Sequence, residues 1–574
     1  MAEEKKLTGY PSIDKPWLNY YTQDAIDARM PICTIYEYIY EANKNHLDDI
    51  ALLYFGNKIT YKELFEQIEK TRNMLLSLGV DKGDIVSVIS ITSPEILYLM
   101  YALSRIGATA NMLDPRMPID VLEKLIIDKE SKYLFVTDIF SGNNDLLYEK
   151  CNLKATITIN MASSMSASYR VGYKVKMGKL PKSKKSISWN NAICNLFNSN
   201  NIKDTGSSDS SVLIVYTGGT TGSPKGVVLS NYNVNAVAEQ YKNSGVNFIR
   251  GQLWQHIAAP FIAYVLVVSS HIPLSLGITG KITIYDSEKI ADDIIKTEYN
   301  HISGNPAVWE KVIHSPKAQT KDFSHLVMPI SGADAINMSL WQEINGFLDS
   351  HNCENHLCNG YGMTELASAV SVNLSKNICK IGSVGIPFTH TTIAAFDLET
   401  CDELKYDERG EICVLGPSIM QGYFNNADAT NEMIRVHKDG KRWLHTGDLG
   451  HVDSDGFVFI DGRIKRMIIR ENGAKVFPGE IETVILKNAN VQKCVVVGKK
   501  ENNSTGSYPV AFIVLNNKCD VNTLKINILS LCEKSLQEYA LPKQIEVVDD
   551  LPLTPIGKID YRALEKLAEE ENDD

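Results

Sequence analysis

Apolar runs of strand length alternate with helical patterns through most of this chain. The runs at 84–91, 133–137, 211–216 and 281–285 are separated by segments with a helical spacing of apolar residues. Strands that alternate with helices in this way are typical of α/β proteins, whose largely parallel sheets are flanked by helices. We therefore expect a large N-terminal α/β domain of mixed or parallel sheets.

The pattern changes near residue 456. A short strand at 456–463 ends in a turn, and a compact segment follows it. This segment is predicted to contain strands at 466–470, 494–498 and 509–515 and helices at 478–487 and 521–539. Such a mixture predicts a separate small α+β domain of about a hundred residues. We place the domains at 1–461 and 462–574, with a hinge at about 461–466 that lets the small domain swivel as a lid.

Composition excludes several classes of protein. The 574 residues are 44% hydrophobic and 22% charged, which fits a globular protein too large for one hydrophobic core. The net charge of −11 makes the chain a poor general binder of polyanions, so nucleic acid is not expected as a partner. Any phosphate that the protein binds must therefore meet locally placed donors.

Two further features bear on the compartment. The eleven cysteines are scattered and odd in number, which predicts reduced thiols and a cytoplasmic protein, and the N-terminus has no apolar segment typical of a secretory signal. Residues 251–280 carry no Asp, Glu, Lys or Arg and could cross a membrane by length alone, but Pro260 and Pro273 interrupt them. We expect a buried helix running into a buried strand there, and no integral membrane segment.

A basic segment at 160–190 stands out from this acidic chain. It is rich in lysine and serine. Charge runs of this kind are usually solvated, so we expect an exposed loop. A binding patch is the alternative interpretation.

The strongest local feature is a glycine-rich segment at 217–226, TGGTTGSPKG, which lies between two apolar runs. Its glycines let the backbone fold closely around an anion, its hydroxyls add donors, and Lys225 adds positive charge. A Walker-type loop would place Ser or Thr after the lysine and then a helix, whereas here a strand is expected. We interpret the segment as a mobile phosphate-binding loop, with an ordinary surface hairpin as the alternative.

Further short motifs follow in a distinctive order. They are SGAD at 331–334, YGMTE at 361–365, GSVGIP at 382–387, RGEICVLGPSIMQGYF at 409–424, HTGDLG at 445–450, DGRIKRMI at 461–468, GAKVFPGEIE at 473–482 and LTPIGKIDYRAL at 553–564. Together with the glycine-rich loop, this set resembles the adenylate-forming enzymes, which comprise acyl-CoA synthetases, peptide-synthetase adenylation domains and luciferases. The chain is most similar to fatty and aryl acyl-CoA synthetases.

The resemblance implies an AMP-forming acid–thiol ligase that uses ATP, Mg²⁺ and coenzyme A. A carboxylate attacks the α-phosphorus of ATP, pyrophosphate leaves, and a thiol then attacks the acyl-adenylate; such chemistry depends mostly on positioning and charge neutralisation. The alternative is a stand-alone adenylation enzyme that loads the phosphopantetheine of a carrier protein. A non-catalytic nucleotide sensor with the same fold is a third interpretation.

The resemblance also implies which residues of the large domain bind ATP. Lys225, Thr364 and Glu365 are the catalytic residues there; Glu365 and Thr217 are the Mg²⁺ ligands, and Tyr361 stacks on adenine. The ATP-binding set of this domain is Thr217, Gly218, Gly219, Thr220, Thr221, Gly222, Lys225, Gly332, Ala333, Tyr361, Gly362, Thr364 and Asp448.

Four residues after the large domain receive roles from the same resemblance. Arg463 is expected to join Asp448 in binding the ribose hydroxyls. Lys558 is expected to be the catalytic lysine that enters with the lid and binds ATP. Lys465 occupies the hinge position, and the loop at Gly473 is expected to line the path of the thiol.

The acyl pocket is expected at Phe261, Tyr264, Asn305 and Gly360. The segments around these residues are mostly small or apolar. They offer no Lys or Asp to hold an α-amino group, which favours an uncharged acyl tail over an amino acid. The expected substrate is therefore a fatty or aryl acid.

Overall fold

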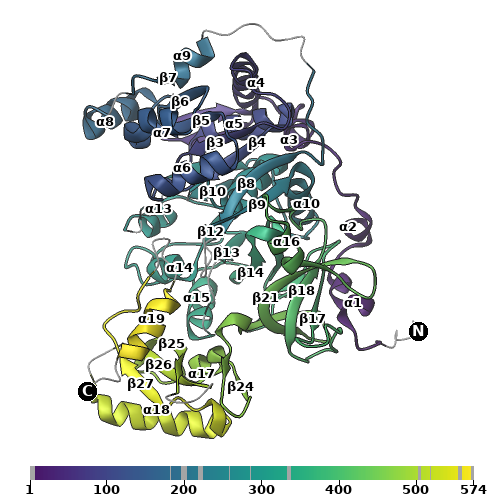
Figure 1. The fold of residues 1–574 in the computed structure, drawn as a ribbon, viewed down its shortest axis with the longest axis vertical. Helices are drawn as coiled ribbons and strands as arrows, with labels where there is room; N and C mark the ends of the chain where they lie inside the picture. Colours follow the sequence, from purple (N-terminus) through teal and green to yellow (C-terminus); the bar gives the residue numbers. More distant parts are fainter. Residues whose placement is uncertain are drawn as a thin grey trace. The chain divides into compact units, whose positions relative to one another are not determined.

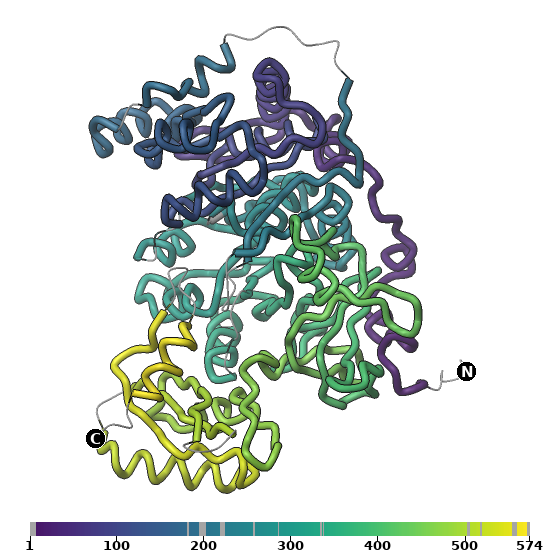
Figure 2. Tube along the Cα trace, in the orientation of Figure 1, coloured from purple at the N-terminus to yellow at the C-terminus, as the bar shows by residue number. Residues whose placement is uncertain are grey.

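The computed structural model describes residues 7–180, 183–194, 203–217, 224–257, 259–284, 286, 288–332, 336, 338–501, 506–516, 519–553 and 559–570. The chain divides into two compact units. The larger unit contains residues 15–392 and 415–444, and the smaller unit contains residues 1–14, 393–414 and 445–574. In Figures 1 and 2 the colours follow the sequence, so that the end of the smaller unit is yellow.

The first sheet of the larger unit has eight strands in the order β19-β9-β8-β4-β3-β5-β6-β7. Its strands are β3 (Ile85–Ile89), β4 (Thr109–Leu113), β5 (Tyr133–Thr137), β6 (Ala155–Ile159), β7 (Ser186–Ser188), β8 (Ser211–Thr217), β9 (Lys225–Ser230) and β19 (Gly422–Tyr423). Strands β3 to β8 pair in parallel, whereas β9 is antiparallel to both of its neighbours. The parallel part confirms the α/β expectation, because its strands are buried and connected by helices.

The second sheet of the larger unit has nine strands in the order β16-β15-β14-β13-β12-β10-β11-β1-β2. Its strands are β1 (Ile50–Tyr54), β2 (Asn57–Thr60), β10 (Leu253–Ile257), β11 (Thr279–Thr283), β12 (His301–Gly304), β13 (Met328–Ser331), β14 (Cys358–Met363), β15 (Ser368–Val372) and β16 (Ile386–Pro387). Strands β1 and β10 to β14 are parallel, and β2, β15 and β16 add antiparallel edges. Parts of three motifs lie on this sheet, namely Ser331, residues 361–363 and Ile386–Pro387.

Helices cover the sheets of the larger unit (Figure 1). They are α2 (Gln23–Asp27), α3 (Ile35–Asn43), α4 (Tyr61–Ser77), α5 (Pro94–Ile106), α6 (Ile119–Asp128), α7 (Asn144–Lys150), α8 (Ala167–Met177), α9 (Trp189–Cys194), α10 (Asn231–Lys242), α11 (Ala263–Leu266), α12 (Ile272–Leu276), α13 (Ile290–Lys296), α14 (Pro306–Ile313), α15 (Met338–Ser350) and α16 (Ala427–Met433). Helices α13 to α15 pack a core around Tyr299, Trp309 and Phe323. Capping boxes begin α3 at Thr34 and α4 at Thr60, which fixes where these helices start.

The uncharged segment 251–280 forms strand β10, the helical residues 263–276 and the start of β11. The buried helix that runs into a buried strand is confirmed, although β10 precedes it and a π-helical turn at Val267–His271 joins α11 to α12. Among the described residues, no helix is long and apolar enough to cross a bilayer.

The expectation of a loop at 160–190 is wrong for residues 167–177, which form α8. The expected exposure is confirmed, since no residue of this helix is buried. Contacts beyond the local sequence stabilise the helix: the hydroxyl of Tyr173 donates to Asp138 Oδ1 at 2.9 Å, and the ring of Tyr169 lies 5.7 Å from that of Phe55. Gly178 ends the helix with φ of 59°, a conformation that favours glycine.

Three histidines are buried in the larger unit, and we call them the core histidines. They are His256, His271 and His301, and each has its Nε2 in a hydrogen bond to a neighbouring side chain. Burial disfavours the charged imidazolium and lowers the pKa of each to about 3. The folded protein therefore keeps these rings neutral well below the pH at which a free histidine takes up a proton.

The smaller unit combines one end of a five-stranded sheet with a separate α+β layer. The five-stranded sheet has the order β17-β18-β21-β20, and β22 also pairs with β21. These strands are β17 (Thr392–Phe396), β18 (Gly410–Leu415), β20 (Ile434–Val436), β21 (Arg442–Val452) and β22 (Val458–Arg463); β20 and the first residues of β21 belong to the larger unit. The α+β layer contains β23 (Ile468–Ile469), β24 (Lys475–Val476), α17 (Pro478–Ile485), β25 (Val491–Lys500), β26 (Ser507–Leu515), α18 (Val521–Ser535), β27 (Gln544–Val547) and α19 (Tyr561–Glu570). The N-terminal helix α1 (Pro11–Asp14) also belongs to this unit.

The α+β layer agrees with the predicted pattern apart from two segments. Only residues 468 and 469 of the predicted strand at 466–470 are extended, because a 3₁₀ turn occupies Ile464–Arg466. The predicted helix at 521–539 ends earlier, at Ser535, because Leu536 is extended. All eleven cysteines are free in the structure.

Candidate functional site

The glycine-rich segment connects two antiparallel strands of the eight-stranded sheet. Thr217 ends β8 and pairs with Lys225, the first residue of β9. A strand therefore follows the lysine, which confirms that this is not a Walker-type loop. The predicted phosphate-binding residues Gly218, Gly219, Thr220, Thr221 and Gly222 lie outside the described residues.

Lys225 begins a chain of three side chains at the end of this hairpin. Its Nζ lies 4.9 Å from the ring centroid of Tyr423, which is on β19 and pairs with β9. The hydroxyl of Tyr423 donates to Oε1 of Glu365 at 2.7 Å. Burial and the charge of Glu365 both raise the pKa of Tyr423, so its hydroxyl stays a donor at neutral pH.

Glu365 lies in the 3₁₀ turn Thr364–Leu366 between β14 and β15, and this turn packs against β8 and β9. The residue is buried, with 5% of its surface exposed. Ala367 follows with φ of 54° and Ser368 with φ of 136°, values that non-glycine residues rarely adopt and that concentrate at functional sites. Thr217, Lys225 and Glu365 thus belong to neighbouring elements, and a carboxylate beside a phosphate loop is a suitable Mg²⁺ ligand.

Tyr361 and Gly362 lie on β14, which pairs with β15 on one side and with β13 on the other. A Cβ at Gly362 would lie 1.7 Å from the carbonyl oxygen of Ser368, so the close approach of the two strands admits no side chain. Gly332 follows β13, and a Cβ there would meet no atom within 4 Å, which leaves open space beside the strand end. Ala333, the other predicted adenine contact, lies outside the described residues.

The four predicted acyl-pocket residues have different surroundings. The guanidinium of Arg116 lies 5.2 Å from the ring centroid of Phe261, and Gly360 is a strand residue of β14. Burial raises the pKa of Tyr264 to about 12. The side-chain oxygen of Asn305 accepts from Val308 N at 3.0 Å, which makes this residue the N-cap of α14.

In the smaller unit, Asp448 and Arg463 face each other across β21 and β22. They are register partners, and Arg463 Nε lies 2.8 Å from Asp448 Oδ1. Only 5% of the aspartate side chain is exposed, against 54% of the arginine side chain. Arg463 also donates to the carbonyl of Thr446 at 3.1 Å. The carboxylate is therefore held in place while the guanidinium remains accessible.

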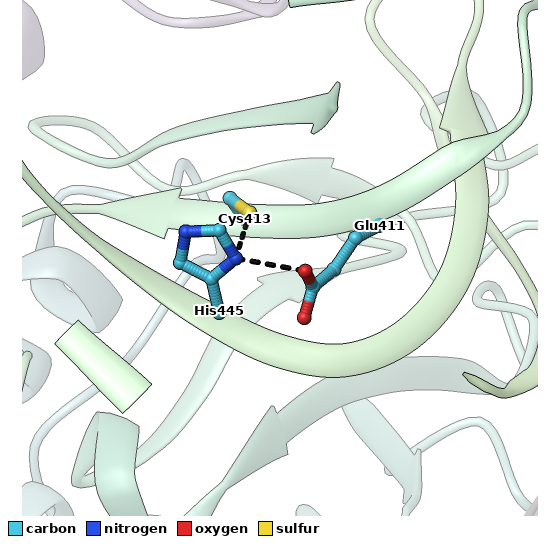
Figure 3. A group of neighbouring side chains, drawn as sticks. All are labelled: Glu411, Cys413 and His445. Atoms are coloured by element: carbon cyan, nitrogen blue, oxygen red, sulfur yellow. Dashed lines mark hydrogen bonds and ion pairs between the residues drawn. The ribbon is translucent and has the colours of Figure 1, made fainter. Parts of the chain in front are cut away.

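A second carboxylate supports this turn from the neighbouring strand, and the sequence analysis did not find it. Glu411 on β18 accepts from Gly447 N through Oε1 at 3.0 Å, and its Oε2 lies 2.8 Å from His445 Nδ1 (Figure 3). Cys413, two residues along β18, places its Sγ 3.5 Å from the same nitrogen. Carboxylate, thiol and imidazole are also metal ligands, but both oxygens of Glu411 already have protein partners. We therefore interpret the group as a hydrogen-bonded brace.

The backbone of the same turn is tied down as well. The hydroxyl of Thr446 donates to the carbonyl of Ile412 at 2.6 Å and accepts from Asp448 N at 3.1 Å. Gly447, with φ of 70°, supplies the left-handed residue that the turn needs. The short motifs containing Glu411 and His445 were noticed in the sequence, but only the pairing of β18 with β21 shows that they meet.

The predicted hinge residue Lys465 and the predicted thiol-path residue Gly473 lie in exposed turns of the smaller unit. Lys465 is exposed in the 3₁₀ turn Ile464–Arg466, which directly follows β22. Gly473 has φ of 77° and lies in the turn that connects β23 to β24. Lys558 lies outside the described residues.

Comparison with known proteins agrees with these motifs. Residues 39–424 match the AMP-binding enzyme family, and residues 480–558 match the AMP-binding enzyme C-terminal domain. The long-chain-fatty-acid–CoA ligase of Salmonella typhimurium is 27% identical over 96% of this chain and 98% of that protein. The 2-succinylbenzoate–CoA ligase of Bacillus cereus is 27% identical over 91% of this chain and 96% of that protein.

A solved structure shows the same fold. The crystal structure of ATP-bound MatB from Rhodopseudomonas palustris has a TM-score of 0.77 and 24% identity, and the match covers 93% of this chain and 98% of that chain. The two family matches together span well over half of the sequence, and they follow each other along the chain in the same order as the motifs. The chain therefore belongs to the AMP-binding enzyme family of adenylate-forming enzymes.

Proposed function

We propose that this protein is an ATP-dependent acid–thiol ligase that makes acyl-coenzyme A thioesters. In the first step a carboxylate oxygen of the acid bonds to the α-phosphorus of ATP, the bond from that phosphorus to the bridging oxygen breaks, and pyrophosphate leaves. In the second step the sulfur of coenzyme A bonds to the acyl carbon, its proton is lost, and AMP leaves. Family membership and the names of the relatives support this proposal.

The observation that carries the proposal is the chain formed by Lys225, Tyr423 and Glu365. A cation and a buried carboxylate lie on neighbouring elements at the end of a glycine-rich hairpin. Phosphoryl chemistry needs this pairing, because the cation neutralises phosphate oxygens and the carboxylate suits the magnesium that accompanies ATP. Tyr423 keeps the carboxylate oriented by donating to one of its oxygens.

Further roles in the larger unit follow from the resemblance. We assign the second Mg²⁺ ligand to Thr217 and the adenine-stacking ring to Tyr361. Thr364, one residue before Glu365, contacts the α-phosphate. Gly332 leaves space for the base, since no atom would oppose a side chain there.

In the smaller unit we assign ribose binding to Asp448 and Arg463. The aspartate is suited to this role, because a fixed carboxylate can accept from two hydroxyl groups at once. Lys558 is the adenylation lysine, and Lys465 and Gly473 serve the hinge and the thiol path. Lys465, Gly473 and Lys558 lie within residues 462–574, the segment that we expect to swivel as a lid, whereas Asp448 precedes it.

We propose a fatty or aryl acid as the substrate. The long-chain-fatty-acid and 2-succinylbenzoate ligases among the relatives both act on acids of this class. The region around Phe261 and Tyr264 offers apolar and aromatic surface. The Arg116 guanidinium over Phe261 is paired with Asp114 at 2.7 Å. The surroundings therefore favour an uncharged tail.

A panel of carboxylic acids in a pyrophosphate-release assay, with and without coenzyme A, tests the proposal. We expect acid-dependent release, and thioester formation only when coenzyme A is present. Acid-dependent release with transfer to a carrier protein but none to coenzyme A would contradict the assigned acceptor. Nucleotide binding without any acid-dependent release would contradict the assigned reaction.

A further inference from the structure

The positive charges of this acidic protein are concentrated in one part of the larger unit. The whole chain has a net charge of −11, yet residues 151–203 contain nine Lys or Arg and no Asp or Glu. Helix α8 and strand β7 form the described centre of this stretch, and β7 is an edge strand of the eight-stranded sheet. Figure 1 shows α8 beside β6 and β7 at the periphery of that sheet.

Helix α8 presents two different faces. Its inner contacts are made by Tyr173, which donates to Asp138, and by Tyr169, whose ring lies 5.7 Å from that of Phe55. Val171 and Val175 are four residues apart and therefore share one face, where 62% and 79% of their surfaces are exposed. The protein core gains nothing from these two valines, because no residue of α8 is buried.

Cationic side chains flank the two valines in the sequence, within α8 and just after it. Six of them are exposed and described: Arg170, Lys174, Lys176, Lys179, Lys184 and Lys185. Within the described part of the chain, none of the six forms an ion pair with a carboxylate. Two acids contact this stretch: Asp138 accepts from Tyr173, and Asp145 accepts from the backbone N–H groups of Lys184 and Lys185. Two carboxylates against six cations leave a surplus of positive charge on this surface.

We propose that the outer face of α8 and its flanking lysines form a docking surface for an anionic lipid bilayer. Apolar side chains between cations fit a bilayer interface, where the valines enter the headgroup region and the lysines meet lipid phosphates. Nucleic acid would use the cations but not two exposed valines, and the ring of Tyr169, although 53% of this residue is exposed, lies against Phe55. The docking surface acts independently of the proposed ligase reaction.

The size of the effect follows from the charges. Each Lys or Arg near an anionic membrane contributes about fivefold in partitioning at moderate ionic strength. Replacing four of the six cations by glutamine should therefore weaken binding by at least about tenfold, even when only some of them reach the lipid at one time. Screening by salt should reduce wild-type binding as well, because the attraction falls off within a Debye length.

Vesicle cosedimentation of the full chain tests this proposal without any substrate. The vesicles contain phosphatidylcholine alone or phosphatidylcholine mixed with phosphatidylglycerol. We expect salt-sensitive binding to the anionic vesicles only. The charge variant carries Lys174→Gln, Lys176→Gln, Lys184→Gln and Lys185→Gln, and it should lose most of this binding.

Two matched variants separate this surface from general effects. The control carries the same change in charge on other exposed lysines, namely Lys62→Gln, Lys70→Gln, Lys124→Gln and Lys534→Gln, and it should bind like wild type. Replacing Val171 and Val175 by serine keeps the charge and should weaken binding by about threefold to tenfold. Equal loss in the control and the charge variant would overturn the proposal, and so would absence of vesicle binding or tighter binding to a short DNA duplex than to anionic vesicles. Pyrophosphate release, measured separately, reports on the ligase proposal alone.

Discussion

Glu411 offers a sharp test of how the smaller unit holds Asp448, the carboxylate that we propose to bind the ribose. Its two oxygens hold Gly447 N and His445 Nδ1, and the turn that they fix contains Asp448. Glu411→Ala removes both acceptors while leaving Asp448 itself unchanged. If the brace positions the carboxylate, the variant should lose use of ATP more than use of the acid.

The magnitude follows from the two hydrogen bonds. A buried donor that loses its acceptor costs about 1–3 kcal/mol. The Glu411 side chain is 15% exposed, so water satisfies part of the loss, and we expect about 2–4 kcal/mol in total for the unfolding free energy of this unit. Because about 1.4 kcal/mol corresponds to tenfold in rate, displacement of Asp448 should lower kcat/KM for ATP by about tenfold to a hundredfold.

Glu411→Gln is a milder version of the same test. Its amide oxygen can still accept from Gly447 N, but its amide nitrogen then faces His445 Nδ1 and fits only when the imidazole carries its proton on Nε2. We expect a loss of about threefold to tenfold in kcat/KM for ATP, because one charge-assisted bond becomes neutral. Glu408→Gln changes an exposed carboxylate three residues away and should leave kcat/KM for ATP and the unfolding free energy unchanged.

Steady-state kinetics for ATP and for the acid, together with urea unfolding, decide the matter. A positioning role predicts a rise in KM for ATP with little change in KM for the acid. If Glu411→Ala lowered stability while the folded enzyme kept kcat/KM for ATP within twofold of wild type, the brace would have only a structural role.

Four further predictions concern both units. Tyr423→Phe removes the donor to Glu365 and should lower adenylation by about tenfold with little loss of stability, as measured by pyrophosphate release at several magnesium concentrations. Gly362→Ala should fail to yield folded protein by circular dichroism, because its methyl group would overlap the backbone of β15. The core histidines take up a proton near pH 6.5 in the unfolded state but only at about pH 3 in the folded state. Lowering the pH from 7 to 5 should therefore lower the unfolding free energy by about 2 kcal/mol for each ring, as followed by urea unfolding. Lys558→Ala should lower the rate of adenylation by a factor of about 10²–10³ but spare thioester formation from a preformed adenylate, with each half-reaction assayed separately.

The sequence predicts the buried strands well because a parallel strand must be apolar on both faces. The run at 133–137 is β5, and the run at 211–216 is β8 apart from its last residue. The same reasoning does not predict helix α8, because its residues are exposed and its contacts are with Phe55 and Asp138 in distant parts of the chain. Polar, exposed elements held by long-range contacts leave no apolar pattern to detect.

The same distinction applies to the candidate site. Lys225, Glu365 and Asp448 stand in motifs whose resemblance to adenylate-forming enzymes implies phosphate, magnesium and ribose binding. Tyr423 and Glu411 act through partners 58 and 34 or more residues away, and only the pairing of β19 with β9 and of β18 with β21 brings them there. The sequence could therefore suggest the groups that we propose to meet the substrate but not the groups that hold them.

The buried carboxylates also bear on whether this protein is an enzyme or a nucleotide sensor. Glycine at 362 is required by the close approach of two strands, so that part of the motif would persist in a protein with the fold alone. Glu365 has no such steric reason: burying a carboxylate that is 5% exposed costs free energy, and the hydrogen bond from Tyr423 offsets part of that cost. A sensor could recognise the nucleotide through ribose and base contacts without this cost. A fold that retains a buried carboxylate in a turn packed against the strand that begins at Lys225 is better explained by catalysis, because such groups are arranged at the expense of stability where charge develops during a reaction.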